Sequence, residues 1–223
     1  AQLRDWQIDE PANEAHNLAL ERLAAIPKRR PQHVLTSIGR LVAQKATLLL
    51  HTKDGSDTPL ERIANDLGRK AVIIVLGSGE RSFEARMLEV AKKLPNLIFL
   101  CGYSEVLADP LYHAGDLFLM PSSFEPCGIS QMLAMRRGQP CVAHAVGGLC
   151  DTIEHAETGF LFSGSTPDAQ ADAFVKTTLD ALALRSDDPV RWQEISKSAA
   201  AQRFDWARSA KQTIKALYLE NND

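Results

Sequence analysis

Short apolar runs alternate with longer segments of mixed polarity along most of the chain. Six of these runs predict strands, and they lie at residues 34–38, 71–76, 97–101, 117–120, 141–144 and 160–162. Several are continuously apolar rather than alternating, which is typical of strands that helices cover on both faces. The pattern therefore predicts a buried sheet.

The segments between these runs carry helical signals. Thr58, Pro59 and Glu61 match a capping box with proline in the first turn, and Gly68 marks the end of that helix. Apolar residues recur at helical spacing over residues 83–94. Further helices are predicted at residues 129–137, 167–184, 189–199 and 205–219.

Because strands and helices alternate, we expect an α/β fold: a doubly wound, parallel, Rossmann-like sheet of about six strands with a C-terminal helical extension. A helical lead-in over residues 1–31 precedes one domain over residues 32–223. Sheets of this kind bind their ligands at the carboxyl ends of the strands. The loops that follow the predicted strands are therefore where binding chemistry is expected.

Composition narrows the class of protein. The 223 residues are 45 % hydrophobic and 24 % charged, the profile of an ordinary soluble globular chain. No apolar run approaches the ~20 residues that a membrane span needs, and the polar N-terminus carries no secretory signal. The net charge of −3 gives no general attraction to nucleic acid. We expect a cytoplasmic protein without a membrane span.

The cysteines and histidines predict neither a metal site nor a disulfide framework. Cys101, Cys127, Cys141 and Cys150 form no CxxC pair, and the six histidines show no metal-ligand spacing. In a chain of this length without a signal, the thiols are expected to be reduced. We expect no metal ion and no cofactor.

The loop after the first strand offers two cations. Gly39 permits a sharp exit from the strand, and Arg40 and Lys45 flank the start of the next predicted helix. Two cations beside helix amides suit a diphosphate. The spacing is not that of a P-loop. The alternative is that both are solvated surface charges.

The next two loops are less specific. Gly77-Ser-Gly79 follows the second strand, but Ser82 stands where a dinucleotide fingerprint needs its third glycine, so a tight turn is favoured. Tyr103 follows the third strand, where an aromatic ring stacks on a nucleobase or serves only as a packing residue.

The loop after the fourth strand is the most informative. Glu125 lies between two prolines, just before a predicted helix whose first turn holds Gly128, Ile129 and Ser130. Backbone amides without a helical partner, together with a hydroxyl, can bind an anion at that position. A fixed carboxylate beside them can accept hydrogen bonds from sugar hydroxyls. The alternative for Glu125 is a helix cap. Gly147–Gly148 after the fifth strand either exposes amides or makes a simple turn.

Taken together, the motifs resemble a known family. The segments GRLVAQK, VLGSGE, GYSE, PSSFEPCGISQMLAMRRGQP and VGGLCDT, and the ending RFDWARSAKQTIKALY, resemble the C-terminal half of bacterial glycogen and starch synthases. The resemblance covers residues 32–219 in order. These enzymes are retaining glycosyltransferases built from two Rossmann-like domains, the GT-B fold, of which this chain resembles one half.

The resemblance implies a donor-binding domain that takes ADP-glucose without a metal ion and delivers glucose to an α-1,4-glucan. It places the diphosphate on Arg40 and Lys45, and on the helix start at Gly128, Ile129 and Ser130. It also makes Tyr103 the base-stacking residue, Glu125 the catalytic carboxylate, and Cys127 and Gly128 neighbours of the sugar. The partner it implies is an N-terminal Rossmann domain, without which the chain is expected to be inactive.

Because of two departures from the family pattern, the identity of the sugar-nucleotide donor is not fixed by the resemblance. Ala46 stands where the family often has glycine. Leu133 stands where glycogen synthases often have tyrosine and related retaining enzymes have a second glutamate. The alternatives are a transferase that uses a UDP- or GDP-sugar and makes another product, and a non-catalytic nucleotide- or glycan-binding module. An NAD-binding domain is the least favoured alternative.

Overall fold

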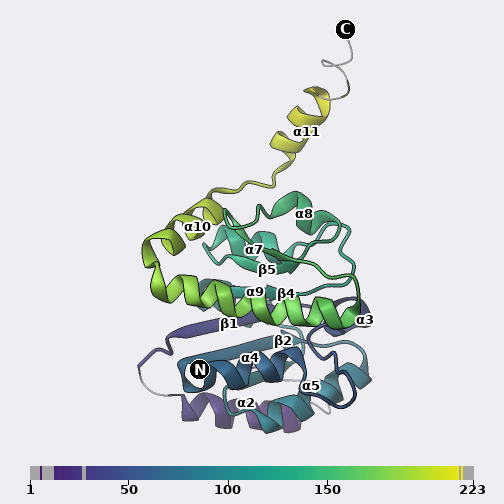
Figure 1. Ribbon diagram of the computed structural model, residues 1–223, viewed down its shortest axis with the longest axis vertical. Helices are drawn as coiled ribbons and strands as arrows, with labels where there is room; N and C mark the ends of the chain where they lie inside the picture. Colours follow the sequence, from purple (N-terminus) through teal and green to yellow (C-terminus); the bar gives the residue numbers. More distant parts are fainter. Residues whose placement is uncertain (1–5, 7–12, 27–28, 216, 218–223) are drawn as a thin grey trace.

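The computed structural model describes residues 6, 13–26, 29–215 and 217 (Figure 1). Parts of the predicted lead-in, at 1–5, 7–12 and 27–28, lie outside the described residues, as do positions 216, 218 and 219 of the last predicted helix. The rest of the chain forms one sheet with helices on both faces. No helix in this described part is long and apolar enough to cross a membrane.

The sheet has six strands in the order β3-β2-β1-β4-β5-β6, and every neighbouring pair is parallel. The predicted doubly wound fold is confirmed. The order reverses between β1 and β4, which makes the carboxyl ends of these two strands a topological switch point. The strands are β1 (His33–Ile38), β2 (Ala71–Gly77), β3 (Leu97–Cys101), β4 (Leu117–Met120), β5 (Cys141–His144) and β6 (Gly159–Phe162).

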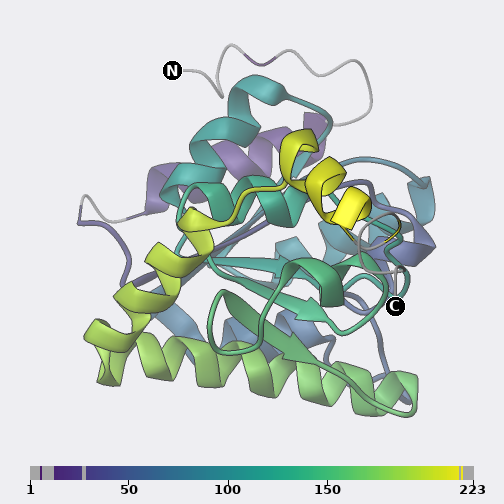
Figure 2. The ribbon, with the colours of Figure 1, turned by 90° about the horizontal axis from the view of Figure 1, so that it is seen from above.

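Helices cover both faces of the sheet, and Figure 2 shows the long α9 on one side and α2 on the other. Apolar side chains from α4, α5 and α9 pack on one face, and those from α2, α6 and α7 pack mainly on the other. α11 stands clear of the body (Figure 1). The helices are α2 (Asn13–Ala25), α3 (Ala43–Ala46), α4 (Pro59–Leu67), η1 (Gly68–Lys70, 3-10), α5 (Arg81–Lys93), α6 (Glu105–Ala114), α7 (Ser130–Arg136), α8 (Gly148–Thr152), α9 (Pro167–Asp187), α10 (Pro189–Ala201) and α11 (Trp206–Ile214).

Local sequence explains where α4 begins and ends. The Thr58 hydroxyl accepts from the amide of Glu61 at 3.2 Å, and the Glu61 carboxylate accepts from the amide of Thr58 at 2.8 Å. Gly68 ends the helix with φ +50°, a conformation that costs glycine little. The predicted capping box is confirmed.

α6 is a helix that the sequence pattern did not reveal. Ser104 caps it by accepting from the amide of Leu107 at 3.2 Å. Pro110 lies inside the helix, where a proline normally argues against helical structure. The cap and the packing of Leu107 and Leu111 against the sheet outweigh that local penalty.

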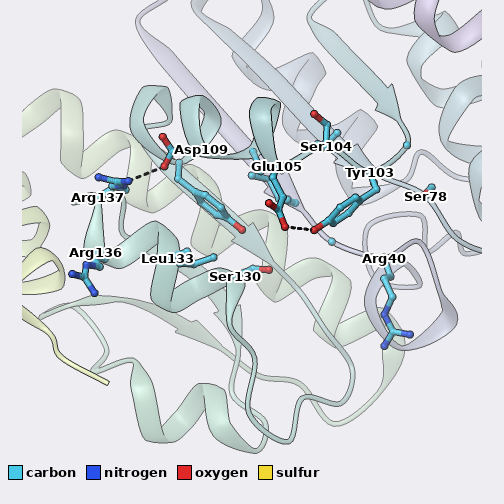
Figure 3. A pocket seen from close by; sticks show the side chains of 17 residues that line it. Arg40, Ser78, Tyr103, Ser104, Glu105, Asp109, Ser130, Leu133, Arg136 and Arg137 are labelled. Atoms are coloured by element: carbon cyan, nitrogen blue, oxygen red, sulfur yellow. Dashed lines mark hydrogen bonds and ion pairs between the residues drawn. The ribbon is translucent and has the colours of Figure 1, made fainter. Parts of the chain in front are cut away.

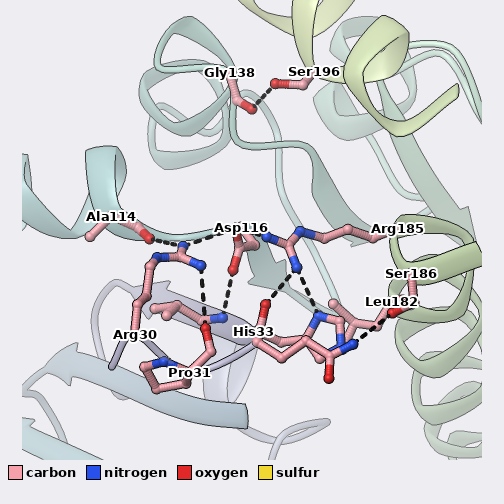
Figure 4. Close-up of polar contacts among 12 residues, drawn as sticks. Arg30, Pro31, His33, Ala114, Asp116, Gly138, Leu182, Arg185, Ser186 and Ser196 are labelled. Carbon is pink, nitrogen blue, oxygen red and sulfur yellow. Dashed lines mark hydrogen bonds and ion pairs between the residues drawn. The ribbon is translucent and has the colours of Figure 1, made fainter. Parts of the chain in front are cut away.

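The amino edge of the sheet is tied together by Asp116, at the start of β4 (Figure 4). Its carboxylate accepts from the amide of Val34 at 2.8 Å, from Arg185 of α9 at 2.7 Å and from Arg30 at 2.9 Å. Burial and the charge of Arg185 lower the pKa of neighbouring His33. This network joins α9 to the switch-point strands at the end opposite the candidate site.

Candidate functional site

The loops after β1 and β4 lie against each other at the carboxyl edge of the sheet. The amide of Ser123 donates to the carbonyl of Gln44 at 2.8 Å, and the Gln44 side chain donates to the carbonyl of Phe124 at 2.5 Å. These contacts hold two distant parts of the chain in a fixed relation. They position Lys45 from one loop beside Glu125 from the other.

Lys45 and Glu125 form an ion pair with 3.0 Å between Nζ and Oε2. The Lys45 side chain is 20 % exposed and that of Glu125 only 7 %. Ser122 donates from its hydroxyl to the same carboxylate oxygen at 3.3 Å. Glu125 is thus a nearly buried carboxylate with a cation beside it, rather than a helix cap.

The backbone of the Glu125 loop rests on Gly147 and Gly148. The amide of Gly148 donates to the carbonyl of Glu125 at 2.9 Å. A Cβ on Gly147 would overlap that carbonyl oxygen, and Gly147 has φ +47°. The glycine pair therefore allows the two backbones to pack closely. The Gly148 amide is not free for a ligand, because it donates to the carbonyl of Glu125.

His144, at the end of β5, supports the same loop. Its Nδ1 lies 3.1 Å from the carbonyl oxygen of Ser122, so Nδ1 carries the proton and donates. Its ring stacks on Phe162 with centroids 5.1 Å apart. Burial lowers the pKa of His144, which keeps it neutral. Sequence reasoning missed this residue, although its place at a strand's carboxyl end was a usable signal.

The side chain of Gln131 fixes the backbone of the segment that follows Glu125. The Gln131 amide group donates to the carbonyls of Cys127 and Gly128 at 3.0 and 3.1 Å. Gly128 has φ +75°, and a Cβ there would collide with the Gln131 side chain. Ile129 stands exposed at the N-cap of α7, and Cys127 is also exposed.

A pocket of about 700 Å³ opens beside these loops, between the ends of β1, β2 and β3 and the helices α6 and α7 (Figure 3). Three of the predicted site residues line it: Arg40, Tyr103 and Ser130. Lys45 lines a small adjoining cavity that shares Gly39 and Arg40 with the pocket. Its other lining residues include Ser78, Ser104, Glu105, Asp109, Leu133, Arg136 and Arg137.

The cations at the pocket differ in how they are engaged. In the part of the chain that the structure describes, the exposed Arg40 has no hydrogen-bond or ion-pair partner, while Lys45 is paired with Glu125. Lys45 lies in the single-turn helix α3, whose start carries no side-chain cap. So short a helix has little dipole, and the anion-binding capacity of this loop rests on the two side chains.

The aromatic side chain at the pocket is Tyr103. Its hydroxyl donates to Glu105 Oε1 at 2.7 Å (Figure 3). That hydrogen bond raises the pKa of Tyr103. At 79 % exposure Tyr103 is not a packing residue, and its ring remains available to a ligand.

Gly77-Ser-Gly79 is a close-packed turn, as the incomplete fingerprint favoured. The amide of Leu41 donates to the carbonyl of Ser78 at 2.9 Å, and the amide of Glu80 donates to the carbonyl of Leu41 at 2.8 Å. A Cβ on Gly77 would overlap the carbonyl oxygen of Gly39. The glycines let the loops after β1 and β2 touch.

The described residues include no cluster of metal ligands, and two of the four cysteines are buried. Within the described residues, no group of three or more His, Cys, Asp and Glu side chains is placed to hold a metal ion. Burial raises the pKa of Cys101 to about 11 and also raises that of Cys141. Both thiols therefore stay protonated near neutral pH.

Comparison with known proteins identifies the family. Residues 32–180 match the model of the glycosyl transferases group 1. A glycogen synthase of Hydrogenovibrio crunogenus is 37 % identical over 192 residues, which are 81 % of this chain and 36 % of that relative.

Comparison with solved structures supports the same family. The catalytic domain of starch synthase IV from Arabidopsis thaliana, bound to ADP and acarbose, matches with a TM-score of 0.66 and 26 % identity, over 91 % of this chain and 41 % of that one. HepE from Anabaena in complex with UDP-glucose has a TM-score of 0.62 at 21 % identity, over 93 % of this chain and 53 % of that one, and shares the fold.

The fold and the family match define the class of protein as a group 1 glycosyltransferase. Within that class the chain belongs to the glycogen and starch synthase family, and it is a C-terminal domain of that type. It spans only 36 % of the Hydrogenovibrio relative's length.

Proposed function

We propose that this domain binds ADP-glucose at the carboxyl edge of its sheet and, joined to an N-terminal Rossmann domain, transfers glucose to an α-1,4-glucan. The observation that carries the proposal is the ion pair between Lys45 and Glu125 at the switch point, next to Arg40, which has no partner among the described residues. Residues 32–223 form the donor-binding unit. Similarity to a glycogen synthase and to a starch synthase with bound ADP supports this choice of donor.

In this proposal the diphosphate lies at Arg40 and Lys45. The amides and hydroxyl at Gly128, Ile129 and Ser130 supply further donors. The nucleoside occupies the pocket beside Tyr103, whose exposed ring suits stacking. The glucose lies near Glu125, with Cys127 and Gly128 as neighbours.

The proposed transfer breaks the bond between the sugar's anomeric carbon and the diphosphate oxygen, which leaves with the electron pair. The acceptor hydroxyl attacks on the same face and its proton passes to the leaving phosphate, so configuration is retained. Arg40 and Lys45 stabilise the charge that develops on the diphosphate, without a metal ion or cofactor. Glu125 fixes the sugar and favours positive charge at its anomeric carbon.

Exposed apolar side chains support an N-terminal partner domain. Phe124, Ile129 and Leu133 are exposed near the site, as are Tyr103 and Val106. Apolar groups gathered at a functional edge are typical of a surface that another domain covers. The partner would also supply the acceptor groove.

Binding is tested by calorimetric titration of this chain with ADP, UDP and NAD, each with and without EDTA. We expect ADP to bind more tightly than UDP, with an affinity that EDTA leaves unchanged. Preference for UDP would replace the proposed donor. Preference for NAD, or a requirement for metal, would contradict the proposal.

Catalysis is tested in a longer chain that carries both halves. Glu125→Gln is expected to lower kcat for glucose transfer by about a hundredfold or more, the usual effect of removing a group that acts in the transition state. Glu157→Gln, which changes an exposed carboxylate paired with Arg191, is the matched control. Full activity of the Glu125 variant would remove this carboxylate from the mechanism.

A further inference from the structure

The backbone on both sides of Tyr103 is fixed, but its side chain is not packed. The amide of Gly102 donates to the carbonyl of Gly77 at 3.1 Å, and Ser104 caps α6. Tyr103 is 79 % exposed. Among the residues described, its hydroxyl has one polar partner, Glu105 Oε1 at 2.7 Å. The direction of the ring therefore depends on that hydrogen bond.

Two carboxylates line the pocket, and they are engaged differently (Figure 3). Asp109 is paired with Arg137 at 2.7 Å and also lies 3.6 Å from His113. Glu105, one turn earlier on α6, makes no ion pair in the described part of the molecule and accepts from Tyr103. Asp109 is therefore engaged by Arg137, whereas Glu105 accepts from the aromatic side chain.

We propose that Glu105 is a positioning residue for nucleotide binding, because it holds the Tyr103 ring at the pocket before the ligand arrives. The inference rests on the proposed function, since it takes the nucleoside to occupy this pocket. A tyrosine side chain turns about two torsions, and ordering it on binding weakens affinity. When the hydrogen bond has already ordered the ring, nucleotide binding loses less conformational entropy and is tighter.

The test compares ADP affinity in the wild type, Glu105→Ala, Glu105→Gln and Tyr103→Phe. The alanine and glutamine variants remove the same charge, but the glutamine amide oxygen still accepts from the phenol. We expect Glu105→Ala to bind ADP about three- to tenfold more weakly than Glu105→Gln, the range that ordering one side chain gives. Tyr103→Phe should weaken binding by about as much as Glu105→Ala.

The double variant Glu105→Ala/Tyr103→Phe separates positioning from direct contact. If Glu105 acts through the phenol, the double variant binds no worse than either single variant. Additive losses would mean that Glu105 touches the nucleotide itself, and would overturn the inference. Equal affinity of Glu105→Ala and Glu105→Gln would also overturn it.

A second readout does not depend on nucleotide. Carbon-13 relaxation of the Tyr103 ring should show an ordered ring in the wild type and Glu105→Gln, and a mobile ring in Glu105→Ala. Equal mobility in all three proteins would overturn the inference even if ADP binds. Failure of the wild type to bind ADP, with the ring ordered as expected, would instead overturn the proposed function.

Discussion

The ion pair between Lys45 and Glu125 couples the two chemical roles of the candidate site. The lysine that is proposed to bind phosphate is held 3.0 Å from the carboxylate that is proposed to hold the sugar. An arriving diphosphate competes with Glu125 for the ammonium group. Phosphate binding and release of the carboxylate toward the sugar are therefore expected to occur together.

Arg40 should contribute more to nucleotide affinity than any cation remote from the pocket, because it is exposed and has no competing partner in the described structure. Arg40→Ala is expected to weaken ADP binding by about 1–3 kcal/mol, the usual scale of a charge-assisted contact. Calorimetry gives the value. Arg69→Ala, at the amino edge of the sheet, is the control, and equal losses in the two variants would contradict the phosphate assignment.

Removing only the lysine should destabilise the fold, because the Glu125 side chain is only 7 % exposed and would lose its ion-pair partner. Lys45→Met is expected to lower the free energy of unfolding by about 1–3 kcal/mol. Adding Glu125→Gln should recover most of that loss, since the buried charge is then gone. Urea unfolding measures both variants, and a double variant no more stable than Lys45→Met would argue against the pair.

Among the elements, the strands and several helices could be predicted because their signals are local. Apolar runs located all six strands, and Thr58 with Glu61 located the start of α4. α6 was missed because Pro110 interrupts its pattern. The motifs named the candidate residues, but the pairing of Lys45 with Glu125 and the support from His144 arise only when distant strands become neighbours.

The contact between the loops after β1 and β2 depends on one glycine. Gly77→Ala would drive a Cβ into the carbonyl oxygen of Gly39, so the two loops must separate. We expect a loss of about 1–3 kcal/mol in the free energy of unfolding, the range for overpacked sites. Gly39→Ala is the control, since its Cβ would meet only the Lys45 Cδ at 3.7 Å. Equal unfolding midpoints in urea would contradict the close approach.

For the molecule as a whole, two buried histidines predict sensitivity to acid. Burial lowers the pKa of both His33 and His144 below the ordinary value of 6.5. Below pH 6.5 the unfolded chain takes up protons that the folded chain resists, so stability is fully present above that pH and falls as the pH drops toward the native pKa values.

The urea midpoint should therefore decrease between about pH 7 and pH 5.5. His144→Asn is expected to reduce this dependence on pH, because it removes one of the two groups responsible. His113→Asn, which changes an exposed histidine on α6, is the comparison variant. An unaltered pH profile in the His144 variant would contradict a buried neutral imidazole at this position.

The central claim is that the pocket at the carboxyl edge of the sheet takes a nucleoside diphosphate. Amide chemical shifts recorded while ADP is added to this chain test it most directly. The account predicts that the largest changes fall in residues 39–45, 102–105 and 128–133. Largest changes instead around the small cavity lined by His51, Arg62 and Asp168, or no changes at saturating ADP, would contradict it.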